Sequence, residues 1–318
     1  MLKNIKLLLT EVAAFFRKDF NIAAYSYAIT VIAASILLIY CTSLGCAISR
    51  NSIPTSNAVI NNMLMFSVMY FMVALPVALI RGEFNSLSKT ALFAKGIFLM
   101  CLIGFADAFS WDAVLNVKEF TMLEQSYIFK ALWRMRNAIF VLPVFVAMRL
   151  LIDRNVKGLY GLCRGSHRIK AYLSVYVVIL PVLIIASFTP EFLSYYPMHK
   201  PWLFEGVFGW PLWLSTVVFE IIYLCDFIMV EMVFRGMLVI GMEPILGQMA
   251  VLPMIAAYVA LHFGKPALET ISAIFGGYFV GSLAYQTHHI WGGIVIHMGI
   301  ALVIELIRLF QHYVLLVG

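Results

Sequence analysis

Residues 219–242 read FEIIYLCDFIMVEMVFRGMLVIGM, and this stretch decides the class of fold. As a helix it is long enough to cross a bilayer, which takes about 20 apolar residues. Yet Glu220, Asp226, Glu231 and Arg235 interrupt its apolar residues. Each ionisable group near the centre of a membrane helix costs at least about 2.5–3.5 kcal/mol on insertion scales. The stretch therefore predicts a membrane helix that carries functional residues.

The rest of the chain has the same character. Of its 318 residues, 63% are hydrophobic and 12% are charged, and the mean hydropathy is +0.95. Soluble domains have only about 45–50% apolar residues, so a soluble protein is excluded. The segments apolar enough to span are 21–46, 59–80, 90–108, 137–152, 171–189, 211–243, 248–262, 268–286 and 292–317. We expect an all-α, polytopic integral membrane helical bundle with about eight to nine transmembrane helices.

The net charge of +6 comes from cations clustered beside apolar spans rather than from one basic face. The largest cluster is Arg149, Arg154, Lys157, Arg164, Arg168 and Lys170. Cations beside spans mark the cytoplasmic side, so we expect this loop and the N-terminus to be cytoplasmic. The first 20 residues predict an interfacial amphipathic helix. Segment 109–136 is expected to lie along the membrane surface or to cap the bundle, and segment 190–210 to form an interfacial loop. The five scattered cysteines indicate neither a disulfide framework nor a metal motif.

Glu231 and Arg235 are spaced by four residues, which predicts contact on one helix face. One hypothesis is that Arg235 only neutralises a buried carboxylate. The other is that Arg235 holds Glu231 ionised as a general base. In the last expected span, 292–317, the spacing of three residues between Glu305 and Arg308 predicts a second local pair.

His262 lies 16 residues after Leu246, in the connection 243–248, and Glu231 lies 15 residues before it. In an antiparallel hairpin, equal distance from the turn means equal depth, so we expect Glu231 to face His262. Glu269 follows a helix end broken by glycine and proline. His297 near the start of the last span would begin on the opposite side, unless a helix between them is tilted or irregular. A lone membrane histidine can instead serve packing or interhelical hydrogen bonding.

Three motifs, VEMVFRG at 230–236, YVALHFGKP at 258–266 and HMGIA at 297–301, occur in that order. Together they resemble the motifs of the CPBP family, the CAAX proteases and bacteriocin-processing enzymes, in a divergent form. The resemblance covers residues 205–318, which we expect to form the CPBP-like core, with N-terminal transmembrane helices in residues 1–204. The sequence departs from the family pattern where Val230 replaces a glutamate, Tyr258 a phenylalanine and Ala301 an Asn or Asp.

The resemblance implies a membrane-embedded endopeptidase that cleaves a CAAX-type or leader peptide. Its catalytic residues would be Glu231, Arg235, His262, His297 and Glu269. The chemistry would need either no cofactor or one zinc ion, and a zinc ion would be held by Glu231, His262 and His297. Without a metal, Glu231 or Glu269 would deprotonate water while the two histidines stabilise the oxyanion. The zinc-protease motif HExxH is absent from the sequence.

The replaced residues Val230 and Ala301 leave an alternative, a catalytically degenerate CPBP-like scaffold that binds a peptide or a membrane partner in an immunity-type role. A transporter is a third hypothesis, because buried acids and histidines also line ion paths. The expected partners are the lipid bilayer and a peptide or lipidated-peptide substrate, with no nucleic acid. We expect a multi-pass protein of a bacterial inner (plasma) membrane.

Overall fold

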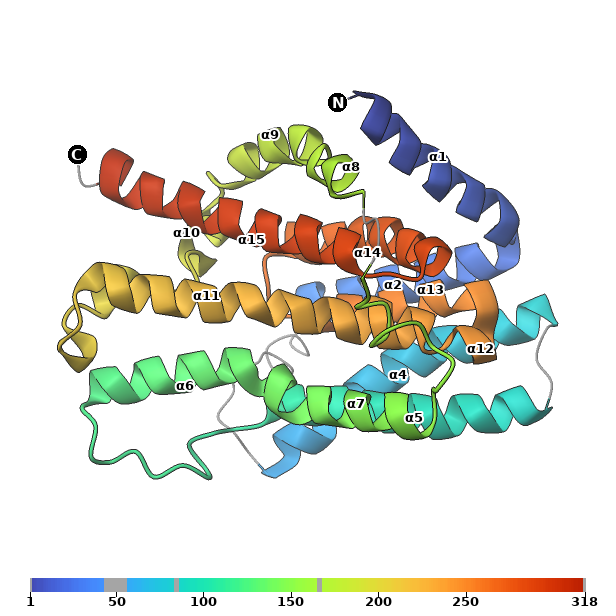
Figure 1. The fold of residues 1–318 in the computed structure, drawn as a ribbon, viewed down its shortest axis with the longest axis horizontal. Coiled ribbons are helices and arrows are strands. Elements are labelled where there is room, and N and C mark those ends of the chain that lie inside the picture. The colour runs from blue at the N-terminus through green and yellow to red at the C-terminus, as the bar shows by residue number, and fades with distance from the viewer. Residues whose placement is uncertain (1, 43–55, 83–85, 165–167, 317–318) are drawn as a thin grey trace.

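The computed structural model describes residues 2–42, 56–82, 86–164 and 168–316. Every regular element in these ranges is a helix. Figure 1 shows the long helices lying side by side, with most of them running along the longest axis of the molecule. The expected all-α helical bundle is confirmed, and the chain is a multi-pass integral membrane protein.

Seven helices in the described part of the chain are long and apolar enough to cross a membrane. They are α2 (Ile22–Cys41), α4 (Ser56–Arg81), α5 (Ser86–Ala108), α6 with α7 (Met122–Leu151), α8 with α9 (Ile169–Ala186), α14 (Ala267–Thr287) and α15 (Trp291–Phe310). The other two expected spans form α11 (Leu212–Glu231) with the π-helix η4 (Met232–Ile240), and α13 (Val251–Leu261). With 11 residues, α13 is only about 16 Å long and too short to cross.

The expectation that 109–136 lies along the membrane surface or caps the bundle was wrong for its second half, which belongs to the candidate span Met122–Leu151. Helix α6 (Met122–Arg136) begins at a capping box between Thr121 and Glu124. It continues through the π-helical turn η1 (Asn137–Val141) into α7 (Leu142–Leu151). The charge of Arg136 is accommodated inside the bundle, because its guanidinium lies 2.5 Å from a carboxylate oxygen of Asp107.

The N-terminal helix α1 (Leu2–Asp19) packs with one face on the bundle and exposes the other. Leu8 and Phe15 are buried, and the ring of Phe15 meets the rings of Tyr278 and Tyr285 in α14. Within the span Ile169–Ala186, α8 covers Ile169–Leu173 and α9 covers Tyr176–Ala186. The remaining short elements are α10 (Pro190–Tyr195), η2 (Pro201–Leu203), η3 (Val207–Gly209), α12 (Glu243–Leu246), η5 (Gly247–Ala250) and η6 (Gln311–Leu316).

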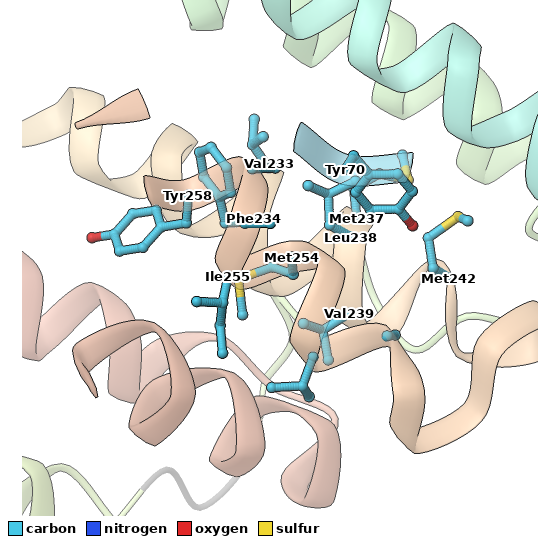
Figure 2. Packing of buried hydrophobic residues seen from close by; sticks show 14 of the residues in the cluster. Tyr70, Val233, Phe234, Met237, Leu238, Val239, Met242, Met254, Ile255 and Tyr258 are labelled. Carbon is cyan, nitrogen blue, oxygen red and sulfur yellow. The ribbon is translucent and has the colours of Figure 1, made fainter. Parts of the chain in front are cut away.

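The centre of the bundle is the hairpin formed by η4 and α13. All nine residues of η4 are buried, and Figure 2 shows Val233 and Met237 packing in the same cluster as Met254 and Ile255 of α13. Gly236 allows a neighbouring loop to approach, since a Cβ atom there would lie 2.7 Å from the carbonyl oxygen of Tyr160. This hairpin brings the C-terminal end of α11 beside the C-terminal end of α13.

Candidate active site

Glu231 is the last residue of α11, and its side chain is 1% exposed. Its Oε1 atom lies 2.9 Å from Nη1 of Arg235 and 3.0 Å from Nδ1 of His297. The expected contact between Glu231 and Arg235 is therefore confirmed. Removing a carboxylate from water is unfavourable unless its charge is matched and its oxygen atoms are hydrogen-bonded. Arg235 supplies that charge one helical turn away.

The second oxygen of Glu231 lies against the backbone of Gly293 in α15. A Cβ atom at Gly293 would collide with this Oε2 atom. Oε2 has no hydrogen-bond partner among the described residues. Gly293 therefore permits the close approach of α15 to Glu231, and the carboxylate is enclosed by protein on both sides.

His297 is held between two groups of different chemistry. The carboxylate of Glu231 can only accept, so Nδ1 of His297 donates to it. In the neutral ring, Nε2 then carries the lone pair, and it lies 3.4 Å from the hydroxyl of Tyr258. The ring of Phe227 covers the imidazole, with ring centroids 4.5 Å apart. Glu231 thus selects the tautomer and the orientation of His297.

His262 follows directly after α13 and is buried. Its Nδ1 atom lies 2.8 Å from the backbone carbonyl oxygen of Tyr258. A carbonyl oxygen only accepts, so Nδ1 donates, and in the neutral ring Nε2 carries the lone pair. The imidazole packs edge-on against the ring of Tyr258, with centroids 4.5 Å apart.

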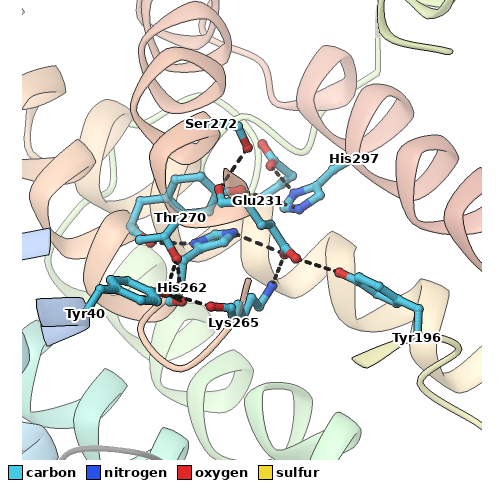
Figure 3. Close-up of polar contacts among 10 residues, drawn as sticks. Tyr40, Tyr196, Glu231, His262, Lys265, Thr270, Ser272 and His297 are labelled. Carbon is cyan, nitrogen blue, oxygen red and sulfur yellow. Dashed lines mark hydrogen bonds and ion pairs between the residues drawn. The ribbon is translucent and has the colours of Figure 1, made fainter. Parts of the chain in front are cut away.

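Glu269, in the first turn of α14, lies close to His262. Figure 3 shows the side chains of His262, Lys265 and Tyr196 pointing toward one another in this part of the site. The Oε1 atom of Glu269 accepts from Nζ of Lys265 at 2.7 Å and lies 4.0 Å from Nε2 of His262. Its Oε2 atom accepts from the hydroxyl of Tyr196 at 2.7 Å. Unlike Glu231, this side chain is 25% exposed.

The turn that carries His262 and Lys265 is fixed by residues that sequence reasoning missed. The hydroxyl of Tyr40 in α2 donates to the carbonyl oxygen of Lys265 at 2.7 Å. The hydroxyl of Thr270 donates to the carbonyl oxygen of His262 at 2.9 Å. Gly264 has a φ of +86° in this turn, a backbone conformation that favours glycine. Only the glycine was a signal in the sequence, because a tyrosine in an apolar span is common.

Tyr258 connects the two groups of residues. The guanidinium of Arg235 lies over its ring, 4.2 Å from the centroid, which is a favourable cation–π distance. The Tyr258 hydroxyl faces His297, while its backbone and ring contact His262. The sequence predicts that Glu231 faces His262, but in the structure the carboxylate of Glu231 bonds to His297.

The five expected site residues thus lie in two adjoining clusters. The enclosed cluster comprises Glu231, Arg235 and His297, and the open cluster comprises Glu269, His262, Lys265 and Tyr196. Tyr196 comes from the segment 190–210, and nothing in its sequence indicated that it reaches the site.

The expected pair between Glu305 and Arg308 was wrong. Glu305 accepts from the backbone N–H of Met198, and Arg308 donates to the carbonyl oxygens of Tyr196 and Leu193. Each side chain therefore bonds to the segment before α11 rather than to its helical neighbour.

The zinc hypothesis requires Glu231, His262 and His297 to share one point. Within the described ranges, no group of three or more His, Cys, Asp or Glu side chains could hold a metal ion. The Oε1 atom of Glu231 is already bonded to Arg235 and His297. These residues do not fit a metal ion in this arrangement, so the chemistry below is derived from the side chains alone.

The residues that depart from the family pattern are buried. Val230 belongs to the central apolar cluster. Ala301 packs among aromatic residues that include Tyr127, Phe219 and Tyr223. Neither position offers a polar group to the two clusters.

Residues 209–303 match the family model described as type II CAAX prenyl endopeptidase Rce1-like. The matched stretch includes both histidines and both glutamates of the two clusters. Comparison with curated proteins gives no match, and comparison with solved structures gives none either. The match supports a membrane endopeptidase as the general class of protein. Over residues 209–303 the expected resemblance to the CPBP family is confirmed, because this C-terminal part of the chain is similar to the Rce1-like type II CAAX prenyl endopeptidases.

Proposed function

We propose that the protein is a membrane-embedded endopeptidase in which His262 and Glu269 activate the attacking water. One observation carries this assignment, the 4.0 Å distance between Nε2 of His262 and Oε1 of Glu269. A water oxygen placed about 2.8 Å from each atom, an ordinary hydrogen-bond distance, bridges such a gap. Glu231 lacks this space because both of its oxygens are enclosed.

The hydrogen bonds at the site assign a role to each atom. Nε2 of His262 and Oε1 of Glu269 are both acceptors, so a bridging water donates one hydrogen to each. The water's lone pairs then point away from both residues, towards an incoming carbonyl carbon. As the new C–O bond forms, Nε2 of His262 takes the proton. It returns this proton to the leaving nitrogen when the C–N bond breaks.

The enclosed cluster supports this chemistry without touching the water. Glu231 fixes the tautomer of His297, as a buried carboxylate fixes the histidine of a catalytic triad. We had expected both histidines to stabilise the oxyanion. In the neutral tautomers inferred here, both Nε2 atoms accept, so the oxyanion needs another donor. We assign this role to the hydroxyl of Tyr258, which lies 3.4 Å from Nε2 of His297 and belongs to a ring that packs against His262.

A second function, a peptide-binding scaffold without activity, is favoured by Val230. Its side chain is buried in the apolar cluster at the position where the family motif has its first glutamate. If that glutamate is essential for cleavage, the remaining residues form a polar site that binds a peptide and leaves it intact.

The test uses the full-length protein in lipid nanodiscs with two probes, a farnesylated fluorogenic CAAX peptide and a fluorogenic leader peptide. We expect cleavage of one probe, with His262→Ala and Glu269→Gln each lowering kcat by about 10²-fold, the scale of a lost acid–base group. The matched control is the pair of His288 and Glu243, whose side chains lie 2.7 Å apart. His288→Ala and Glu243→Gln should leave kcat unchanged.

Two results would overturn the proposal. Full activity of His262→Ala or Glu269→Gln would remove the water-activating role of the open cluster. If the natural protein cleaves neither probe and Val230→Glu creates cleavage, the protein is a scaffold and binding becomes its function.

A further inference from the structure

The last turns of α15 and the residue that follows it carry three buried polar side chains, Glu305, Arg308 and Gln311. Their spacing of three places them along one face of the helix. Buried charges are unfavourable unless they are hydrogen-bonded, so their partners indicate what this face does. All three bond to the segment between Ser187 and Met198.

Each of these side chains bonds to a backbone group or to a short side chain of that segment. Both carboxylate oxygens of Glu305 accept from the N–H of Met198, at 2.9 and 3.1 Å. Arg308 donates from Nε to the carbonyl oxygen of Tyr196 at 3.1 Å. Gln311 donates from Nε2 to the hydroxyl of Ser187 at 2.8 Å. The polar face of α15 therefore fixes the path of the chain on both sides of Tyr196.

Tyr196 is itself buried, and its hydroxyl donates to Oε2 of Glu269 at 2.7 Å. Burial, together with the negative charge of Glu269, raises the pKa of Tyr196 well above its usual value. The hydroxyl therefore keeps its proton and remains a donor at any working pH.

We propose that Tyr196 is a positioning residue for Glu269, and that the polar face of α15 formed by Glu305, Arg308 and Gln311 holds Tyr196 in place. The catalytic part of this inference rests on the proposed function. All four residues lie outside the matched stretch 209–303. The residues that position Glu269 in this proposal thus come from parts of the chain outside the matched stretch.

The physical reason lies in the two oxygens of the Glu269 carboxylate. Lys265 bonds to Oε1 and Tyr196 bonds to Oε2, so together they fix the rotation of the group. Without Tyr196 the carboxylate can turn, and the distance between Oε1 and His262 is no longer set. Small misplacements of a reacting group lower rates strongly.

The kinetic test compares Tyr196→Phe with Tyr195→Phe, a control that removes a neighbouring hydroxyl. We expect Tyr196→Phe to lower kcat by about tenfold with KM unchanged, and Tyr195→Phe to have no effect. In a Glu269→Ala background, Tyr196→Phe should cause no further loss, because the group that it positions is gone. An equal loss in both backgrounds would overturn the proposal.

A second measurement does not need activity. In thermal unfolding of the protein in nanodiscs, Tyr196→Phe should lower Tm in the natural background and leave it unchanged with Glu269→Ala. Gln311→Leu should lower Tm in both backgrounds, since it acts on Ser187. If the natural protein cleaves neither probe, only the proposed function is refuted. The Tm comparison still tests whether Tyr196 bonds to Glu269. Additive Tm shifts for Tyr196→Phe and Glu269→Ala would refute the proposal that Tyr196 positions Glu269.

Discussion

The protein contains two pairs of glutamate and histidine that differ in distance and in the exposure of the glutamate, which is 1% for Glu231 and 25% for Glu269. In the enclosed cluster, Glu231 bonds directly to His297 at 3.0 Å. In the open cluster, Glu269 lies 4.0 Å from His262. The first pair is joined by a hydrogen bond, whereas the two atoms of the second pair are too far apart for one. In the proposed function, the first pair orients His297 and the second pair activates water.

The cations of the two clusters show the same contrast. Arg235 and Glu231 form an i,i+4 pair with side chains 2% and 1% exposed, and Lys265 and Glu269 form one with side chains 23% and 25% exposed. Arginine suits the enclosed pair because its guanidinium is always charged and lies over the ring of Tyr258. The comparison predicts very different consequences when each cation is removed.

The largest effect is expected for Arg235→Leu, which leaves the carboxylate of Glu231 buried without its cation. Breaking a buried pair in this way lowers the free energy of unfolding by about 3–5 kcal/mol. Lys265→Leu, at a partly exposed pair, should lower it by less than about 1 kcal/mol. Unfolding of the detergent-solubilised variants by denaturant measures both changes.

The double variant Glu231→Gln with Arg235→Leu is the control for this prediction. It removes both charges, so it should be less destabilised than Arg235→Leu alone. Equal losses for the Arg235 and Lys265 variants would mean that the two clusters do not differ in burial as described.

Unlike the charged residues of the two clusters, His199 is a buried ionisable group without an ionic partner among the described residues. Its side chain is 1% exposed and stacks between the rings of Phe204 and Phe219. Neither ring nitrogen has a hydrogen-bond partner within the described residues. Burial, with a smaller contribution from the charge of Lys130, lowers the pKa of His199 to about 4.

The sign of the resulting pH dependence follows from this lowered pKa. Between about pH 6.5 and pH 4 the unfolded chain binds a proton at His199 that the folded protein does not, so stability falls as the pH falls. The loss is about 3 kcal/mol over that range. Denaturant unfolding at pH 7 and pH 4.5 should show most of this loss of stability. In His199→Phe the part of the loss that is due to His199 should be absent. An unchanged pH dependence in His199→Phe would contradict the assignment.

Local periodicity predicted some contacts correctly, although it failed for Glu305 and Arg308, which bond to a distant segment. The pairing of Glu231 with Arg235 follows from helical spacing alone. The hairpin of η4 and α13 follows from two apolar segments around a short connection. Both features depend on residues close in the sequence, for which the geometry of a helix is sufficient information.

Features that depend on how distant helices cross were not predictable in this way. The depth argument treated the helices as parallel rods, which placed His297 away from His262. In the structure both rings contact Tyr258, because α15 approaches Glu231 closely at Gly293. The contribution of Tyr196 was missed for a related reason: the path of an irregular segment leaves no periodic pattern in the sequence.

The smallest expected effect concerns Tyr258, the residue that joins the two clusters. Tyr258→Phe removes only the hydroxyl, so the ring still contacts Arg235 and His262. The lost hydrogen bond to His297 is long at 3.4 Å and contributes about 1 kcal/mol or less to stability. We therefore expect little change in unfolding and a loss in kcat of about threefold, since backbone donors or water can replace one oxyanion donor in part.

The control for Tyr258 is Tyr258→Leu, which also removes the ring. It should destabilise the protein clearly more than Tyr258→Phe, because the cation–π contact with Arg235 and the packing against His262 are lost together. Peptide cleavage and denaturant unfolding are measured for both variants. A loss of 10²-fold or more in Tyr258→Phe would mean that neither backbone donors nor water replace the hydroxyl as the oxyanion donor. Unchanged kcat in both variants would mean that the enclosed and open clusters do not act through Tyr258, and the link between them would have to be sought in the backbone of α13.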